Sequence, residues 1–155
     1  MQTDTRPSLA ATMTEDLLQH LPFPQLMSVK IDGVRAIREN DTFYSRTGRM
    51  FPNTLLHKRF SGLPDFDLEI VNGSPVAPNV CDITRGMCNS YGNDVSQAAL
   101  YVFDILGFDN LAFRARFKKA ERLVNEVKIA LPEMPVHIVE HVEVNSVEEI
   151  LEFEE

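Results

Sequence analysis

The sequence predicts an α+β fold in which helices pack on a mixed, largely antiparallel sheet. Several short runs rich in β-branched and aromatic residues are separated by turn-forming residues, and these runs predict strands. One long stretch has the periodicity of an amphipathic helix. The order of these segments implies a mixed sheet with packed helices. A chain of 155 residues, 44% of them hydrophobic, is long enough to form one compact core.

The N-terminal half is predicted to hold a short helix followed by an antiparallel meander. We expect residues 1–7 to form a flexible tail and residues 8–155 to form the domain. Turn-forming pairs at Asp32-Gly33 and Asn40-Asp41 separate the first strands, and Asn53 is placed to cap a helix. The expected elements are a helix over 8–20 (Leu9, Met13, Leu17 and Leu18 on one side), strands over 25–30, 34–38 and 42–45, a helix over 53–60 and a strand over 67–71.

The C-terminal half is predicted to combine one buried strand, one long helix and a last strand. Residues 77–96 have weak periodicity and many turn formers, so we expect loop with a short helix there. Ser146, with Glu149 three residues later, forms a capping box that opens a final helix. The other expected elements are a strand over 99–106, an amphipathic helix over 111–130 and a strand over 136–144.

The net charge of −8 argues against tight, independent binding of DNA by this chain. Proteins that hold a duplex by its phosphates usually have a basic face, because neutralising phosphates releases counterions. Acidic residues are concentrated in residues 137–155, whereas residues 114–128 are comparatively basic. We therefore expect nicked DNA to be bound weakly or indirectly.

The sequence has no membrane-protein or disulfide pattern. No apolar run approaches the length of a membrane span, and the N-terminus lacks the layout of a signal peptide. We expect a soluble protein without a membrane partner, in the cytoplasm, or in the host cytoplasm if the source is a virus. Cys81 and Cys88 lack metal-ligand spacing and are expected to stay reduced.

Four short segments carry residues suited to chemistry on a nucleotide. Lys30 precedes the Asp32-Gly33 turn, which would present its amine at the mouth of a pocket, and a desolvated amine can attack phosphorus. Arg46 lies in Ser-Arg-Thr-Gly, and a guanidinium matches phosphate with a planar fork. Glu69 and Phe103 lie in strand-like runs, where a carboxylate and an aromatic ring can face a pocket.

Each segment taken alone also has a structural interpretation. A lysine or arginine beside a hairpin turn is commonplace at a protein surface. Period-2 alternation puts Asp67, Glu69 and Val71 on one face of a strand, which can be a solvent face. Phe103 can be a core residue, and Asp104 can cap a turn.

Taken in order, the four segments resemble the covalent nucleotidyltransferase superfamily of DNA ligases, RNA ligases and capping enzymes. Within it, the chain is similar to ATP-dependent DNA ligases of bacteriophage type, from about Pro7 onward. The resemblance rests on Leu9-Ala10-Ala11, Ser28 to Gly33 with Arg35, Ser45-Arg46-x-Gly48 followed by Pro52-Asn53, Asp67-x-Glu69, Phe103-Asp104, and more loosely Cys81 to Met87. It implies an ATP-grasp-like adenylation domain.

The resemblance implies a role for each matching residue. Lys30 would attack the α-phosphate of ATP and form lysyl-AMP. Arg35 and Arg46 would contact ribose and phosphates, or later the 5′-phosphate of a nick. The remaining implied assignments are Ser28 to the ATP site, Glu69 to the ribose or the catalytic Mg²⁺, and Phe103 to stacking on adenine. Leu68 stands where the family normally has glycine, so the backbone beside Glu69 has less conformational freedom than in the family.

Two motifs that complete the family's ATP pocket are missing from these residues. After Asp104 the sequence contains no Glu-Gly and no Lys-x-Lys. We expect that these residues do not include the family's OB fold. We therefore expect an N-terminal part of the adenylation domain, inactive or very weak alone, that needs a second polypeptide. Two alternatives stay open: an RNA ligase or capping-type enzyme, and a non-catalytic binding protein with the same fold.

Overall fold

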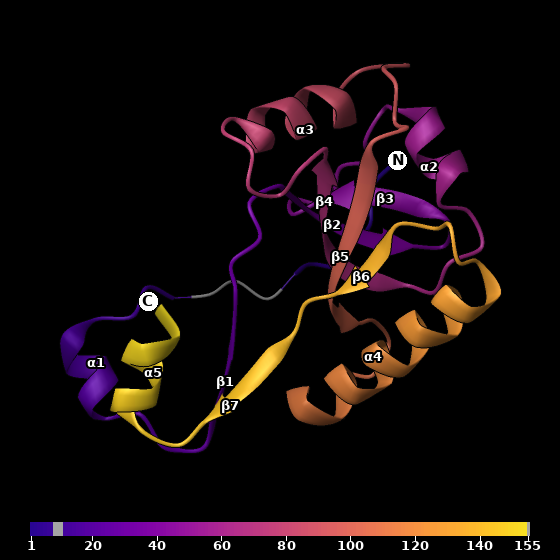
Figure 1. Cartoon of the computed structure of the whole chain (residues 1–155). Coiled ribbons are helices and arrows are strands. Elements are labelled where there is room, and N and C mark those ends of the chain that lie inside the picture. The colour runs from indigo at the N-terminus through magenta and orange to yellow at the C-terminus, as the bar shows by residue number, and fades with distance from the viewer. Residues whose placement is uncertain (8–10, 155) are drawn as a thin grey trace. The chain divides into compact units, whose positions relative to one another are not determined.

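The computed structural model describes residues 1–7 and 11–154, and the chain divides into two compact units (Figure 1). The larger unit comprises Met1–Pro7 and Ile31–Ile138, and the smaller unit comprises Ser8–Lys30 and Val139–Glu155. The chain passes from the smaller to the larger unit directly after Lys30 and returns after Ile138.

The larger unit is built on a five-stranded sheet of order β3-β2-β4-β5-β6. All neighbouring strands are antiparallel except β5 and β6, which are parallel. The strands are β2 Val34–Glu39, β3 Thr42–Ser45, β4 Phe66–Asn72, β5 Ala98–Ile105 and β6 Val136–Ile138. The predicted α+β class with a mixed, largely antiparallel sheet is confirmed.

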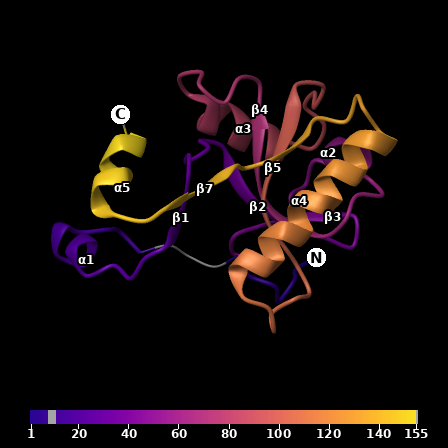
Figure 2. The same cartoon turned by 60° about the horizontal axis from the view of Figure 1, so that its bottom comes forward.

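Three helices pack on this sheet and share one hydrophobic core with it. They are α2 Thr54–Arg59, which contacts β3, α3 Val80–Cys88, which contacts β2 and β4, and α4 Phe113–Ala130, which lies along β5 and β6 (Figure 2). In α4 the buried residues Ala120, Val124 and Val127 recur at helical spacing, which explains why this stretch folds as an amphipathic helix. Leu68, Ile70, Leu100 and Val102 supply the apolar face of the sheet.

The β2–β3 hairpin turns at Asn40 and Asp41, both with positive φ (49° and 61°). Two successive residues with positive φ are typical of the tight turn whose twist matches that of paired strands. Asn and Asp tolerate this conformation better than most residues. The predicted turn and the predicted strand over 42–45 are therefore confirmed.

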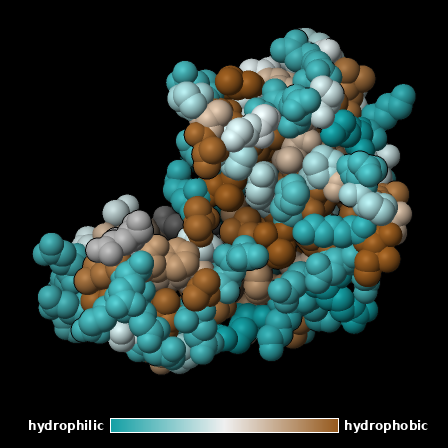
Figure 3. Space-filling view, in the orientation of Figure 1, coloured by the Kyte–Doolittle hydropathy of each residue, from teal (hydrophilic) through white to brown (hydrophobic). Residues whose placement is uncertain are grey.

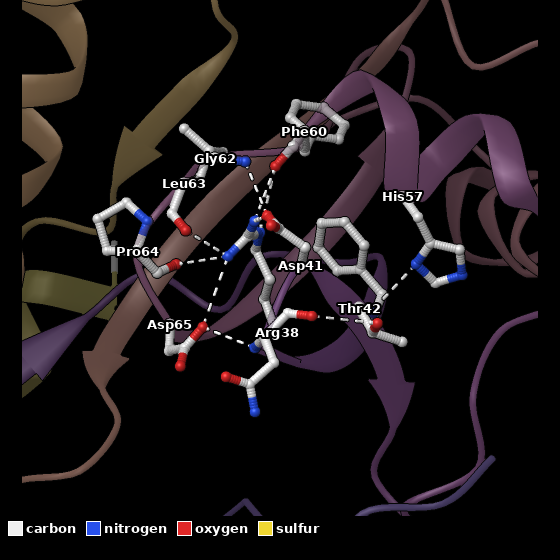
Figure 4. Close-up of polar contacts among 11 residues, drawn as sticks. Arg38, Asp41, Thr42, His57, Phe60, Gly62, Leu63, Pro64 and Asp65 are labelled. Atoms are coloured by element: carbon white, nitrogen blue, oxygen red, sulfur yellow. Dashed lines mark hydrogen bonds and ion pairs between the residues drawn. The ribbon is translucent and has the colours of Figure 1, made fainter.

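A buried arginine fastens this hairpin to the α2–β4 loop (Figure 4). The guanidinium of Arg38, only 1% exposed, donates to the main-chain carbonyls of Phe60 (3.0 Å), Leu63 and Pro64 (3.0 Å), and to the carboxylate of Asp41. Burial lowers the pKa of Arg38 from its ordinary value, and the Asp41 carboxylate opposes that shift. We call these contacts the Arg38 network. They fix the hairpin whose strands lead to Arg35 and Arg46.

Residues 1–7, expected as a flexible tail, make specific contacts with the larger unit. The hydroxyls of Thr3 and Thr5 donate to the two carboxylate oxygens of Glu39 at the end of β2, and these bonds lower the pKa of Glu39. The amide of Thr3 donates to the carbonyl of Gly48 (3.0 Å). Pro7 is buried.

The smaller unit contains a two-stranded sheet and two helices. β1 Gln25–Ser28 pairs antiparallel with β7 His141–Val144, and the helices are α1 Glu15–Gln19 and α5 Val147–Glu154. Within the described residues β1 and β7 pair only with each other. Apolar side chains are open at the surface of this unit (Figure 3), among them Val29, Leu17 and Met13, and an apolar cavity of about 230 Å³ lies between its elements.

Three predicted elements differ from the structure. The helix predicted over 8–20 begins only at Glu15, because the side chain of Thr14 accepts the amide of Leu17 and caps it there. Residues 8–10, including Leu9 and Ala10, lie outside the described part of the chain. The strand predicted over 25–30 ends at Ser28 and pairs with β7, so it is not part of a meander with β2.

The strand predicted over 136–144 is also two strands in the structure. Val136–Ile138 joins the large sheet, and His141–Val144 pairs with β1. The run of alternating apolar residues contains no glycine, proline or asparagine to mark a break, so period-2 alternation alone could not divide it. The predicted cap by Ser146 is confirmed, because the amide of Glu149 donates to Ser146 Oγ (3.2 Å), whereas the Glu149 carboxylate accepts the amide of Asn145 (2.8 Å), one residue before the cap. Among the described residues, no helix is long and apolar enough to cross a membrane.

Candidate functional site

The face of the large sheet opposite the core carries a row of polar and aromatic side chains. Arg35, Glu69, Tyr101 and His137 lie opposite one another on β2, β4, β5 and β6. They alternate along their strands with the core residues Leu68, Ile70, Leu100 and Val102. Glu69 is therefore on the face that the alternation predicted, and it is half-buried there.

Phe103 lies on the same face as Tyr101, and a β-bulge at Phe103 turns Asp104 to that face as well, opposite Asp67. The pairing of β4 with β5 passes from Asp67↔Asp104 to Leu68↔Val102 and so skips Phe103. An unpaired extra residue re-aims neighbouring side chains, a device often found beside functional sites. Phe103 is half-buried outside the core, so its interpretation as a core residue is wrong.

Arg35 is held in a fixed orientation by two neighbours. Its Nε and Nη2 donate to the two carboxylate oxygens of Asp67 at 2.7 and 2.8 Å, and Asp67 is buried. These hydrogen bonds raise the pKa of Arg35 above its ordinary value. The guanidinium also lies over the ring of Phe103, 5.0 Å from its centroid. Arg35 is therefore a preorganised cation rather than a mobile surface side chain.

Glu69 is joined to the glycine of the Lys-x-Asp-Gly segment. The amide of Gly33 donates to Glu69 Oε1 at 3.1 Å. A Cβ on Gly33 would lie 2.3 Å from the carbonyl oxygen of Ile70, so only glycine allows β4 to approach this closely. The sequence predicted that the Asp32-Gly33 pair closes a hairpin, and it does not, because β1 pairs with β7 and not with β2. The pair leads the chain from Lys30 into β2, beside Ile70 of β4.

Arg46 and Arg35 line one cavity of about 410 Å³ in the larger unit. Arg46 is exposed in the turn after β3, which is closed by Gly48 with a positive φ of 81°. A third arginine, Arg85 of α3, reaches the same cavity. The described lining residues include no carboxylate; they are Gly33, Val34, Arg35, Ser45, Arg46, Thr47, Phe51, Arg85 and Asn89.

Ser28 and Lys30 belong to the smaller unit. Ser28 is the last residue of β1, opposite His141 of β7, and is half-buried. Lys30 is exposed, two residues beyond the end of β1, whereas the sequence predicted it at the end of a buried strand. Glu69 belongs to the larger unit, so the arrangement of Lys30 and Glu69 around one cleft stays a prediction.

The described residues contain no cluster of three or more His, Cys, Asp or Glu side chains that would hold a metal ion. Glu69, the predicted metal ligand, already accepts the Gly33 amide through Oε1, and Asp67 is occupied by Arg35. These side chains therefore do not form a metal site of their own. Mg²⁺ typically binds one or two carboxylates together with substrate phosphates.

Three residues that shape the cavity or its surroundings lie in segments that carry the resemblance, but the sequence analysis assigned them no role in the site. Asp67 orients Arg35, and Arg85 lines the cavity wall. Asn53, fully buried, caps α2 and also donates to Met87 O (2.9 Å) and Asn93 O (3.1 Å), which ties it to the end of α3. The inward pattern of Val80, Thr84 and Met87 was the available indication that residue 85 faces away from the core.

Comparison of sequences finds no relative, because no protein-family model and no curated protein matches the chain. Comparison of structures finds several similar proteins. The adenylated DNA ligase of Chlorella virus superposes with a TM-score of 0.78 at 25% identity, over 97% of this chain and 55% of that one. The ATP-dependent DNA ligase of bacteriophage T7, in complex with ATP, superposes with a TM-score of 0.62 at 15% identity, over 83% of this chain and 51% of that one.

A Lig E DNA ligase also superposes, with a TM-score of 0.61 at 20% identity, over 83% of this chain and 49% of that one. The chain thus spans about half the length of these ligases. It has the α+β fold of the nucleotidyltransferase domain of ATP-dependent DNA ligases and matches part of that domain.

Proposed function

We propose that this chain supplies the nucleophile and part of the nucleotide site of an ATP-dependent DNA ligase. The observation that carries the proposal is the contact between Gly33 and β4. Through the bond from the Gly33 amide to Glu69, it joins the Lys-x-Asp-Gly segment to the predicted nucleotide-binding glutamate. A surface hairpin with an unrelated lysine would not need a glycine packed against the Ile70 carbonyl.

The proposed reaction starts at Lys30. The lone pair of Lys30 Nζ attacks the α-phosphorus of ATP, and the bond to the bridging oxygen of the β-phosphate breaks. Pyrophosphate leaves with the bonding electrons, the amine gives its proton to solvent, and AMP stays on Lys30 as a phosphoramidate. In a ligase the adenylyl group then passes to the 5′-phosphate of a nick.

The other predicted site residues would bind and orient the nucleotide. Arg35, fixed by Asp67, and Arg46 would contact phosphate oxygens with planar guanidinium forks. One face of the Phe103 ring lies under Arg35, so adenine would stack on the opposite face. Glu69 would accept a ribose hydroxyl, and Ser28 is the remaining residue that the resemblance assigns to the ATP site.

Magnesium enters this proposal with the nucleotide, as MgATP. It would offset negative charge on the phosphate oxygens, and Glu69 is the one predicted protein ligand on this chain.

We further propose that a second polypeptide or further chain supplies the groups these residues lack. Lys-x-Lys is absent from the sequence after Asp104, and such lysines would stabilise charge on the α-phosphate. Among the described residues no third strand joins the β1–β7 sheet, and apolar side chains of the smaller unit are exposed, which supports a covering partner. Nicked DNA would be held mainly by the complete assembly.

The test measures transfer of label to the chain from ATP that is labelled at its α-phosphate, in the presence of Mg²⁺. It is carried out with the chain alone and with a second polypeptide that carries the Lys-x-Lys motif. Wild type and Lys58→Ala, which changes an exposed lysine of α2, should be labelled equally. Lys30→Ala should not be labelled. Lys30→Arg should be equally inactive, because a guanidinium stays protonated. Labelling that survives Lys30→Ala would contradict the proposal.

A further inference from the structure

We infer that Arg85 of α3 is a third phosphate-binding residue of the cavity that Arg35 and Arg46 line. The inference rests on the proposed function for the identity of the ligand, a phosphate group either of the ATP tail or of the DNA strand. Nothing in the motif order assigned a role to Arg85.

The position of Arg85 follows from how α3 is fastened. Thr84, fully buried, accepts the amide of Asn72 at the end of β4 (2.9 Å). Asn53 holds the other end of the helix through the carbonyl of Met87. With both contacts made, α3 cannot rotate about its axis, and the residue after Thr84 faces the cavity rather than the core.

The charge of the cavity favours an anion. The chain carries a net charge of −8, yet the described lining of this cavity holds three arginines and no carboxylate. Ser45, Thr47 and Asn89 add neutral hydrogen-bonding groups to the same wall. A concave wall with several guanidinium groups matches the charge and shape of a phosphate group.

Asp82 competes with a phosphate for Arg85, so removing Arg85 and removing the Asp82 charge should have opposite effects on phosphate binding. Arg85 Nη1 donates to Asp82 at 2.9 Å, and both side chains of this pair are largely exposed. An exposed ion pair of this kind contributes little to stability. Arg85 can therefore exchange Asp82 for a phosphate, and removing the Asp82 charge should favour that exchange.

The experiment titrates the chain with two probes, inorganic pyrophosphate and a dye-labelled nicked duplex bearing a 5′-phosphate. Arg85→Ala should weaken binding of at least one probe about three- to tenfold, and for the duplex it should reduce the slope of log K against log salt by about 0.9. Asp82→Asn should strengthen the same binding. The control Lys58→Ala, which removes an exposed cation of α2 outside the cavity lining, should bind as wild type.

The probe that responds identifies the source of the phosphate. Equal binding by wild type and Arg85→Ala for both probes, absence of binding by wild type, or weaker binding by Asp82→Asn would overturn the inference. Labelling of wild type by ATP is measured in parallel. If Lys30 takes no label while Arg85-dependent binding persists, the proposed function fails and the phosphate site stands.

Discussion

Replacing Arg38 by methionine should strongly destabilise the larger unit. Methionine keeps most of the apolar stem of Arg38 and removes the guanidinium. The main-chain carbonyls of Phe60, Leu63 and Pro64 then lose their donors from the Arg38 network, at a site that is 1% exposed. The Asp41 carboxylate loses its ion-pair partner as well, but it can be solvated because it is exposed.

The expected cost is about 3–5 kcal/mol of the free energy of unfolding. Removing one partner from a buried, charged hydrogen-bond network typically costs that much, because the groups left behind are neither paired nor hydrated. For a chain of this size the melting temperature should fall by roughly 6–20 °C. Urea unfolding followed by circular dichroism measures the loss directly.

The control is Arg122→Met, because Arg122 forms an exposed ion pair with Glu126 within α4. Its expected cost is at most about 0.5 kcal/mol. Arg38→Lys should stay close to Arg38→Met, since an ammonium cannot reach several carbonyls as a planar fork does. A loss below about 1 kcal/mol for Arg38→Met would refute the claim that unsatisfied carbonyls determine the cost.

Three further predictions test other features of the fold. Gly33→Ala should lower the free energy of unfolding by about 1–3 kcal/mol and lower adenylation, because the new Cβ would meet the Ile70 carbonyl. Gly86→Ala should raise the free energy of unfolding by up to about 1 kcal/mol, because Gly86 has open space around it in α3. Thermal melting compares the two variants, and equal shifts in melting temperature would contradict the packing argument. Asn53→Ala should lower the free energy of unfolding by about 2–4 kcal/mol, measured with urea, because it removes contacts to both α2 and α3. A loss of about 1 kcal/mol, typical of one helix cap, would show that the contacts to α3 are unimportant. Burial raises the pKa of Cys88 from 9.0 to about 12, so the folded state keeps a proton that the unfolded thiol releases above pH 9.0. Stability should therefore fall by about 2 kcal/mol between pH 9 and 10.5, and a slope that persists unchanged in Cys88→Ala would assign it to other groups.

Local patterns in the sequence predicted the elements of the larger unit well. Asn40-Asp41 predicted the hairpin turn, and Asn53 predicted the start of α2, because both residues act on the backbone within a few positions. Period-2 alternation placed Glu69 on the face opposite Leu68, since side-chain direction in a strand is a local property.

Long-range partners could not be predicted in this way. The pairing of β1 with β7 joins residues more than a hundred positions apart, and alternation does not specify which strand will pair with which. The bulge at Phe103 depends on the register between β4 and β5. Arg85 reaches the cavity only because Thr84 and Asn53 fasten α3, and both contacts are tertiary.

The central claim is that Lys30 is the residue that carries AMP, and peptide-mapping mass spectrometry tests it most directly. The purified chain is incubated with MgATP, with and without a polypeptide that carries Lys-x-Lys, then digested under conditions that preserve phosphoramidates. We expect one adenylyl group, on the peptide containing Lys30, and we expect it to be lost when excess pyrophosphate is added before digestion. An adenylyl group on any other residue, or none in the presence of the complementing polypeptide, would contradict it.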